Sequence, residues 1–338
     1  MLSNPGVIII GAGPAGCAAA LQCRLRGVNV LLIPGHQKHL HGQALESVHP
    51  GVISLLANLQ AEHSIKLASK GTYEGIAIGD EFHPLGADEN GNWKGHHIDR
   101  YLFDNALLQT AIAKGVELLE DDPAKDLIID DGRVAGIMTS SGKKISARYV
   151  IDASGQRSVS RKAHVFKTKY YSRPLVAWTG TSDVEDDVLF AGKKKVKFIP
   201  QKNGWSWLAM HDDNTCTWTC LAKKGIHAFI PPEELSSFPL KSRIDVFNRR
   251  WRLSRPACFE GIVLCGDAAA IIDPAAGQGI LTALLSGIMA ANTVKACMDV
   301  PDFEGLELAK YDQWLVNYFE EKLTRLQELY CGHGIDIS

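Results

Sequence analysis

The stretch VIIIGAGPAG at residues 7–16 decides how the chain begins to fold. Four β-branched apolar residues predict a buried strand, and the glycines after them predict a tight turn that opens a helix. In such a turn Gly11 makes the bend, Gly13 lets the backbone approach a pyrophosphate, and Gly16 lets the helix pack on the strand. Free N–H groups at the helix N-terminus suit negatively charged phosphates. The stretch therefore predicts a dinucleotide-binding unit.

The segments that follow complete this unit except for one residue. A helix is expected over residues 17–26 and a second strand over residues 28–33. The second strand of a dinucleotide-binding unit usually ends in Asp or Glu, which binds the ribose hydroxyls, but here Pro and Gly follow at 34–35. Either His36 or Gln37 replaces the acid or the contact is lost, and a lost hydrogen bond to a charged group costs about 1.5–3 kcal/mol. We therefore expect weak binding, with some of the purified protein empty.

Three later stretches resemble the places where a flavin nucleotide is held. The residues GDAA at 266–269 follow an apolar run, and Asp267 would accept hydrogen bonds from ribityl hydroxyls. The residues DPAAGQGI at 273–280 then open a helix of small residues, whose N-terminus can stabilise negative charge on a reduced flavin ring. The residues IDASG at 151–155 place the carboxylate of Asp152 and free amides at a third strand end. Together with the first turn, these stretches predict FAD as the cofactor.

The composition argues against several other classes of protein. Lys and Arg number 36 and Asp and Glu 38, so the formal net charge of −2 gives no general attraction to nucleic acid or to anionic membranes. The eight cysteines show no paired framework, which indicates free thiols in a reducing compartment. Residues 277–294 are too few and too rich in Gly and Ala for a membrane span, and His36, His39 and His41 match no metal-ligand spacing. We expect a cytoplasmic protein with no membrane span, nucleic-acid partner or metal.

The pattern along the chain predicts two regions that meet at a cleft. Short strands and turn signals fill residues 116–151, and residues 166–255 consist mostly of strands with period-two alternation, as in TCTWTC at 215–220. The last quarter returns to a strand, a helix of small residues and a long helix near residues 306–329. The two ends of the chain therefore share a nucleotide-binding character around an antiparallel-sheet insertion, and such an arrangement leaves a cleft for a small molecule.

In this order, the flavin motifs resemble the family that includes class A flavin monooxygenases, flavin-dependent halogenases and geranylgeranyl reductases. The resemblance covers nearly the whole chain and implies an α/β fold, with a Rossmann-like FAD-binding domain of the glutathione-reductase type and an antiparallel-sheet substrate domain. The chain has no second Gly-x-Gly-x-x-Gly motif, so electrons are expected from a separate reductase or directly from NAD(P)H. The FAD-binding domain is expected at 1–75, 96–165 and 256–338, and the substrate or partner domain at 76–95 and 166–255.

Two segments are similar to the halogenase branch of this family. The residues LESVHP at 45–50 are similar to its Gly-Glu-Ser-x-x-Pro segment, with Leu in place of Gly. The residues HHIDRYLFD at 96–104 are similar to its helix entry, where an arginine, here Arg100, borders the flavin. Halogenases also carry Trp-x-Trp-x-Ile-Pro and a lysine that relays hypohalous acid. The residues WSWLAM at 205–210 begin like the first but lack Ile-Pro, and Lys70 lies where the lysine would fall, although a solvent-facing lysine is the simpler interpretation.

The short substrate domain instead resembles the flavoproteins that help form cysteine tryptophylquinone in glycine and lysine oxidases. That resemblance implies an FAD-dependent oxidoreductase, a monooxygenase that hydroxylates a protein tryptophan in the precursor of a quinone-dependent oxidase. Two alternatives stay open: a halogenase or small-molecule aromatic hydroxylase, and an FAD-containing maturation chaperone without turnover. The candidates for catalysis are His49, Glu46 and Lys70. The residues expected to bind FAD are Gly11, Gly13, Pro14, Ala15, Gly16, Arg100, Asp152, Gly155, Gly266, Asp267, Pro274, Gly277, Gln278, Gly279 and Ile280.

Overall fold

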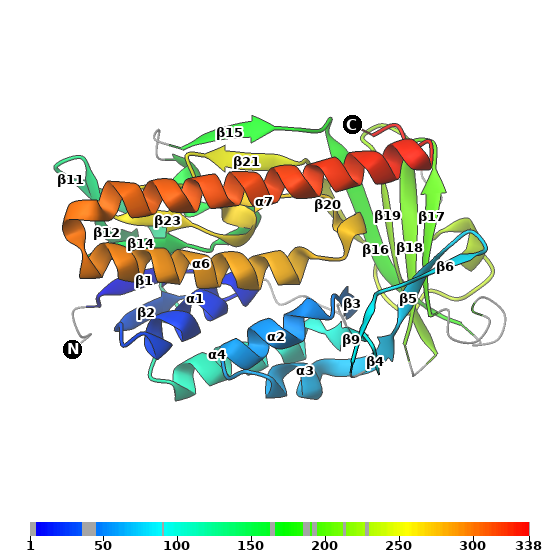
Figure 1. Ribbon diagram of the computed structural model, residues 1–338, viewed down its shortest axis with the longest axis horizontal. Coiled ribbons are helices and arrows are strands. Elements are labelled where there is room, and N and C mark those ends of the chain that lie inside the picture. Colours follow the sequence, from blue (N-terminus) through cyan, green and yellow to red (C-terminus); the bar gives the residue numbers. More distant parts are fainter. Residues whose placement is uncertain are drawn as a thin grey trace.

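Two large sheets, joined by a long C-terminal helix, organise the computed structural model of the chain (Figure 1). The structure describes residues 5–35, 45–89, 91–162, 166–184, 190, 195–211, 214–226 and 230–337. The α-helices in this part are α1 (Pro14–Leu25), α2 (Gly51–Asn58), α3 (His63–Ala68), α4 (Arg100–Ala113), α6 (Gly279–Asp299) and α7 (Glu304–Gly332).

A six-stranded sheet carries the glycine-rich turn. Its strand order is β10-β2-β1-β14-β23-β22; the first five strands are parallel and β22 is antiparallel to β23. The four central strands are buried along their whole length, as expected for parallel strands covered on both faces. The sheet confirms the predicted α/β class. Its strands are β1 (Val7–Ile10), β2 (Val30–Ile33), β10 (Glu117–Leu118), β14 (Tyr149–Asp152), β22 (Cys258–Phe259) and β23 (Ile262–Leu264).

A seven-stranded sheet forms the other half of the molecule, with the order β20-β16-β19-β18-β17-β5-β6. All neighbouring strands are antiparallel except the β17–β5 pair. The sheet confirms that antiparallel strands dominate the predicted insertion, whereas the exact division into domains stays a prediction. Its strands are β5 (Gly75–Ile78), β6 (Glu81–Pro84), β16 (Leu175–Asp183), β17 (Val196–Gln201), β18 (Gly204–Met210), β19 (Thr215–Lys223) and β20 (Asp245–Arg249).

Smaller sheets complete the fold. The order β3-β9-β4 lies between α4 and the large antiparallel sheet, and the order β15-β21-β24 runs alongside α7 (Figure 1). The remaining sheets are a three-stranded β11-β12-β13 meander and a β7-β8 hairpin. The strands are β3 (Leu45–Val48), β4 (Ser69–Tyr73), β7 (Ala87–Asp88), β8 (Gly91–Asn92), β9 (Gly95–Asp99), β11 (Ala124–Asp130), β12 (Arg133–Thr139), β13 (Lys144–Ser146), β15 (Lys167–Tyr170), β21 (Arg252–Arg255) and β24 (Ala270–Ile271).

The expected element boundaries differ from the observed ones near the first turn. Helix α1 begins at Pro14 rather than at residue 17, because proline is well suited to the first helical position. Strand β2 begins at Val30 rather than at residue 28, since the Val28 N–H donates to the Cys23 carbonyl at the end of α1. The long C-terminal helix was expected near 306–329 and extends over Glu304–Gly332.

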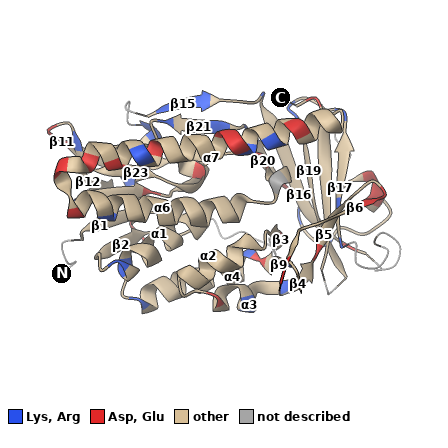
Figure 2. Ribbon diagram, in the orientation of Figure 1, with Lys and Arg blue, Asp and Glu red and all other residues tan. Residues whose placement is uncertain are grey.

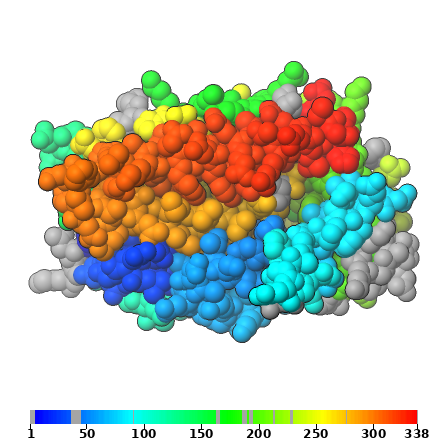
Figure 3. Space-filling model, in the orientation of Figure 1, coloured from blue at the N-terminus to red at the C-terminus, as the bar shows by residue number. Residues whose placement is uncertain are grey.

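Helices α6 and α7 lie side by side over one face of the molecule (Figure 1). Helix α6 shows almost no charged residues, whereas α7 alternates both signs along its visible face (Figure 2). Helix α7 forms a continuous band across the surface (Figure 3), and its far end packs on the seven-stranded sheet through Leu326 and Tyr330. Within the described residues α6 alone has the length and mean hydropathy, 1.5, of a membrane span, and half of that window is buried inside the protein. Its contacts with α1 and α7 are those of a core helix.

The contact between α1 and α6 depends on small residues. A Cβ atom placed on Gly287 of α6 would overlap the Ala15 carbonyl oxygen of α1 and lie 3.1 Å from the Ala19 nitrogen. These are backbone atoms, which cannot turn aside as a side chain would. Any larger residue at this position therefore separates the two helices.

We expect the substitution Gly287→Ala to lower the free energy of unfolding by about 1–3 kcal/mol, since it overpacks a rigid contact. Chemical denaturation measures this value. Gly305→Ala is the matched control, because a Cβ there meets nothing within 4 Å, and alanine in a helix is favoured over glycine by up to about 1 kcal/mol. Equal stability of the two variants would contradict the packing argument.

Candidate functional site

The glycine-rich turn has the geometry that its sequence predicts. Gly11 has a φ of +101°, and a Cβ on it would overlap the Ala153 carbonyl group. A Cβ on Gly16 would overlap the Gly11 carbonyl oxygen, so this glycine allows α1 to approach β1. Around Gly13 a Cβ would meet nothing within 4 Å, and no side chain caps the helix that begins at Pro14. The open space and the uncapped N–H groups fit a pyrophosphate.

A cavity of about 510 Å³ extends from this turn to the seven-stranded sheet. Alternate residues of β16, β18 and β19 face it, as the period of two along a strand requires. The opposite face of the same strands packs Cys216, Trp218 and Cys220 into a separate apolar core. The predicted alternation is therefore correct, and it places a threonine- and tryptophan-rich wall on the cavity. These wall residues are Ala177, Thr179, Thr181, Trp205, Trp207, Ala209, Thr217 and Thr219.

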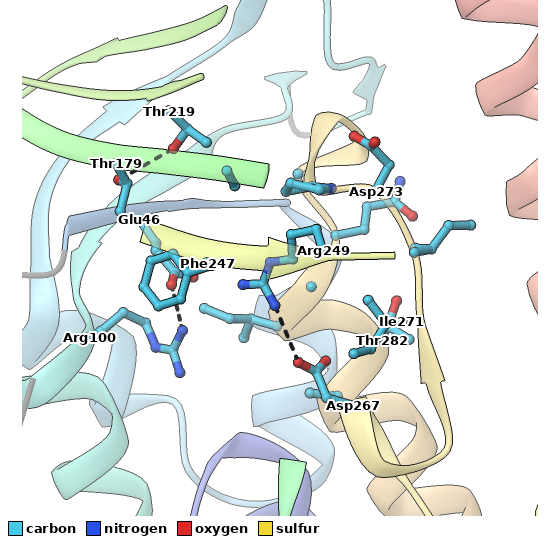
Figure 4. A pocket seen from close by; sticks show the side chains of 18 of the residues that line it. Glu46, Arg100, Thr179, Thr219, Phe247, Arg249, Asp267, Ile271, Asp273 and Thr282 are labelled. Carbon is cyan, nitrogen blue, oxygen red and sulfur yellow. Dashed lines mark hydrogen bonds and ion pairs between the residues drawn. The ribbon is translucent and has the colours of Figure 1, made fainter. Parts of the chain in front are cut away.

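Two pairs of opposite charge lie inside the cavity (Figure 4). The Arg100 Nη1 atom is 2.6 Å from Glu46 Oε1, and its Nη2 atom is 3.0 Å from Asp104 Oδ2. Burial would lower the pKa of Arg100, but Glu46 and Asp104 outweigh burial and raise it, so the guanidinium stays charged. The second pair joins Arg249 Nη1 to Asp267 Oδ2 at 3.9 Å.

Asp267 lies deep in the molecule, yet 49% of its side chain is exposed because it faces the open cavity. Burial raises the pKa of this carboxyl group, while Arg249 and Arg100 act to lower it. Its position after β23, beside the N-terminus of α6, is the one expected of a residue that binds ribityl hydroxyls. The carboxylate is available to a ligand that enters the cavity.

A buried hydrogen-bond network fixes the loop that follows Asp267. Asp273 is 2% exposed, and its carboxylate accepts from the Ala275 N–H at 2.8 Å and from Trp251 Nε1 at 3.0 Å. Trp251 stacks on Tyr330 of α7 with ring centroids 5.8 Å apart. The Tyr330 hydroxyl accepts from Trp205 Nε1 at 3.0 Å. The network therefore ties the loop to both α7 and the cavity wall.

Most of the predicted cofactor-binding residues come together around this cavity. The turn before α1, the β14 and β23 ends and the loop before α6 all contribute to its lining. Gly11 and Gly16 lie behind the surface and shape it. The predicted residues that line the cavity are Gly13, Pro14, Ala15, Glu46, Arg100, Gly155, Gly266, Asp267, Pro274, Gly277, Gln278, Gly279 and Ile280.

Asp152 is placed differently from the expectation. It is fully buried, and its carboxylate accepts from the Ser154 N–H at 2.9 Å, the Ser158 hydroxyl at 3.0 Å and the Ser160 N–H at 2.9 Å. The loop after β14 thus satisfies this carboxylate completely, which turns it away from the cavity. Asp152 shapes the loop, and its neighbours Ala153 and Gly155 provide the surface.

Two of the three catalytic candidates also lie away from the cavity lining. The His49 ring accepts the Gly51 N–H at Nδ1, 3.0 Å away, and so caps α2. Burial and the nearby Lys322 lower the pKa of His49, which favours the neutral ring that this bond needs. Lys70 is half-buried on β4 and is absent from the cavity lining. Of the three candidates, Glu46 alone lines the cavity.

The sequence patterns missed two contributors to the cavity. Strand β20 supplies Phe247 and Arg249, and helix α7 supplies Phe319 and Lys322. Neither segment carries a motif, and only the folded topology brings them to the site. His36 and Gln37, considered as replacements for the ribose-binding acid, lie outside the described residues. In the described part of the chain no group of three His, Cys, Asp or Glu residues is arranged to hold a metal ion.

The Asp273 network makes stability depend on pH. Burial raises the pKa of Asp273 from 3.8 to about 6, against the hydrogen bonds that it accepts. The folded protein therefore binds this proton more tightly than the unfolded chain, and stability falls as the pH rises from about 4 to about 6. At about 1.4 kcal/mol per pKa unit, the carboxylate costs on the order of 3 kcal/mol above that range.

We expect Asp273→Asn to lack this dependence. The altered hydrogen bonds of the variant add an offset to its free energy of unfolding that is the same at every pH. Relative to the unchanged protein, the variant's free energy of unfolding rises by on the order of 3 kcal/mol between pH 4 and pH 7.5. Denaturant titrations at the two pH values measure the difference. The same offset at both would show that Asp273 does not titrate as described.

Comparison with known proteins agrees with this geometry. The model of the FAD binding domain family matches residues 5–291. A 1H-pyrrole-2-carbonyl-(peptidyl-carrier protein) brominase of Pseudoalteromonas luteoviolacea is 24% identical over 88% of this chain and 79% of its own. A digeranylgeranylglycerophospholipid reductase of Methanocella arvoryzae is 28% identical over 92% and 83%.

Solved structures share the fold. A peptidyl tryptophan dihydroxylase, QhpG, essential for tryptophylquinone cofactor biogenesis, superposes with a TM-score of 0.71 at 19% identity. The match covers 94% of this chain and 72% of that one. The predicted resemblance to the halogenase and monooxygenase superfamily is thereby confirmed, and so is the prediction of FAD. Since the family model spans most of the residues that build the turn and the cavity, the chain belongs to the FAD binding domain family and is an FAD-dependent oxidoreductase.

Proposed function

We propose that this protein is a monooxygenase that hydroxylates a tryptophan side chain of a partner protein during tryptophylquinone cofactor biogenesis. The partner is the precursor of a quinone-dependent oxidase. The observation that carries the proposal is that the cavity lining includes the exposed Arg243, which precedes β20. Strand β20 is the edge of the seven-stranded sheet. A side chain that is still attached to a polypeptide can enter from such an edge.

The cavity wall suits an indole ring. Trp205, Trp207 and Phe247 offer aromatic surfaces, and aromatic rings favour stacked or edge-to-face contacts. The Thr179 and Thr219 hydroxyls lie on the same wall, 3.4 Å apart (Figure 4), and can accept the indole N–H. The fold likeness to a peptidyl tryptophan dihydroxylase supports the same substrate class.

Different residues around the cavity have different roles in this reaction. Bound FAD supplies the redox chemistry, with electrons from a separate reductase or from NAD(P)H. The turn at Gly13 would hold the pyrophosphate, and Asp267 would hold the ribityl chain. Arg100 would border the flavin with its charge largely compensated by Glu46 and Asp104, and Glu46 is the one catalytic candidate that lines the cavity.

Halogenation is the alternative that one further observation favours. A halogenase needs a lysine in its cavity, and Lys322 of α7 is present there, whereas Lys70 is not. Burial and Arg325 lower the pKa of Lys322, which increases the fraction of neutral amine. A brominase among the relatives supports this reading. The second alternative, an FAD-containing maturation chaperone without turnover, differs in needing no catalysis.

We also propose a cytoplasmic location. All eight cysteines are in the described part of the chain and all are free thiols, seven of them buried. A reducing compartment maintains such thiols.

We expect the FAD-loaded, chemically reduced protein to add one oxygen atom to a tryptophan-containing peptide in air, and to leave free tryptophan unchanged. Mass spectrometry of the peptide detects the product. Repeating the reaction with bromide present tests the alternative, because a halogenase adds bromine and loses that activity in Lys322→Ala. Turnover of free tryptophan or indole alone would contradict a protein substrate.

The Gly13→Ala variant separates catalysis from chaperoning. We expect an unchanged melting temperature, because the new methyl group meets no protein atom, and at least about tenfold weaker FAD binding, since the methyl group occupies the approach of the pyrophosphate. Flavin fluorescence titration measures the affinity, and Gly305→Ala is the control. Partner maturation that persists in Gly13→Ala without bound FAD would select the chaperone alternative.

A further inference from the structure

Two buried histidines from different sheets touch each other behind the cavity wall. His97 lies on β9 and is fully buried, and His211 follows β18 and is 2% exposed. Their ring centroids are 4.8 Å apart, with the ring planes at 56°. Tyr73 of β4 also stacks on His97, at 5.0 Å. The contact joins the small β3-β9-β4 sheet to the seven-stranded sheet.

Each histidine also holds the hydroxyl group of a residue that lines the cavity. Ser47 Oγ is 2.9 Å from His97 Nδ1, and the two residues are directly paired across β3 and β9. Thr217 Oγ1 is 2.7 Å from His211 Nε2. Ser47 and Thr217 stand on different walls of the cavity. The histidine pair therefore links one hydroxyl on each wall through the protein interior.

The surroundings of His97 keep its ring neutral. Burial lowers the pKa of His97 most, and His211, Lys195 and His96 lower it further. His211 and Lys195 approach His97 from the side of the seven-stranded sheet, and His96 is the residue before His97 on β9. Tyr73 contributes a neutral ring, because burial raises the pKa of its phenol. All the cationic neighbours thus oppose a charge on His97.

A neutral imidazole carries one N–H, and its position decides what Ser47 can do. His97 Nε2 is buried and has no hydrogen-bond partner in the part of the chain that the structure describes. A hydrogen on Nε2 would be an orphaned buried donor, which is rarer in proteins than an orphaned acceptor. The hydrogen therefore belongs on Nδ1, where it is donated to Ser47 Oγ. The hydrogen of Ser47 itself is then free to point into the cavity.

We propose that His97 is a positioning residue that holds Ser47 as a hydrogen-bond donor to the bound FAD. His211, anchored by Thr217, keeps His97 neutral and in place. Ser47 follows Glu46, the partner of Arg100, on β3, and both residues line the cavity. The inference rests on FAD binding alone and is independent of the substrate.

Flavin fluorescence titrations of four variants test the proposal. The amide of Asn replaces an Nδ1–H donor, and the longer Gln places its amide nearer the Nε2 position. We expect Ser47→Ala and His97→Gln to weaken FAD binding by roughly three- to tenfold, as for one lost hydrogen bond. The FAD affinity of His97→Asn should stay within about twofold of that of the unchanged protein. The double variant Ser47→Ala/His97→Gln should bind FAD no more weakly than Ser47→Ala alone.

His96→Gln is the matched control, since this neighbouring histidine bonds Ser69 rather than Ser47. Equal effects of Asn and Gln at position 97, or losses that multiply in the double variant, would overturn the proposal. A melting temperature that falls in step with affinity across the variants would indicate a packing role and overturn it as well.

Nitrogen NMR of the unchanged protein gives a second readout that needs neither FAD nor turnover. The His97 signals, assigned with His97→Asn, should show a protonated Nδ1 and a bare Nε2 from about pH 6 to about pH 8. A hydrogen on Nε2, or titration of the ring within this range, would overturn the proposal even if a variant failed to fold.

Discussion

The close packing of α1 against α6 is the constraint on which the rest of the cavity depends. Ala15 of α1 is enclosed by two glycines: a Cβ on Gly266 would lie 2.8 Å from the Ala15 Cβ, and one on Gly287 would overlap the Ala15 carbonyl oxygen. This spacing brings the first residues of both helices, Pro14 and Gly279, to one cavity. Two helix N-termini then direct partial positive charge at the same ligand, which favours an anionic one.

Those helix ends matter more for binding here because Arg100 is already paired within the protein. Arg100 is paired with Glu46 and Asp104, so its charge is largely compensated before any ligand binds. Strand β2 ends without the acid that would bind a ribose. Among the described residues, the backbone N–H groups around Gly13 and the carboxylate of Asp267 are therefore the groups we propose for dinucleotide binding.

The sequence predicted the features that depend on local motifs or on a repeating pattern of side chains. It missed the residues that only the folded topology brings to the cavity. The strand, turn and helix at 7–25 follow from local rules, and so does the face of β19 that Thr217 and Thr219 share. Arg249 and Lys322 could not be foreseen, because no motif marks β20 or α7 as part of the site. Asp152 was predicted to bind the cofactor at a strand end and His49 was a catalytic candidate, but the hydrogen bonds of both are satisfied within their own loops. A sequence shows which groups are polar, whereas the fold decides which of them remain available.

Polar contacts hold the two halves of the molecule together at both ends of the cavity. At one end, the contacts from Asp273 through Trp251 and Tyr330 to Trp205 tie the loop before α6 to the large sheet. At the other end, the His97–His211 contact ties the small sheet to it. Buried polar groups that lose a partner cost more than apolar contacts of the same size, so each junction tolerates little displacement. The cavity between them is consequently bounded by hydrogen bonds at one end and by a histidine ring contact at the other, while the apolar cores on either side supply most of the stability. A change at a junction should therefore alter the geometry of the site before it unfolds the protein.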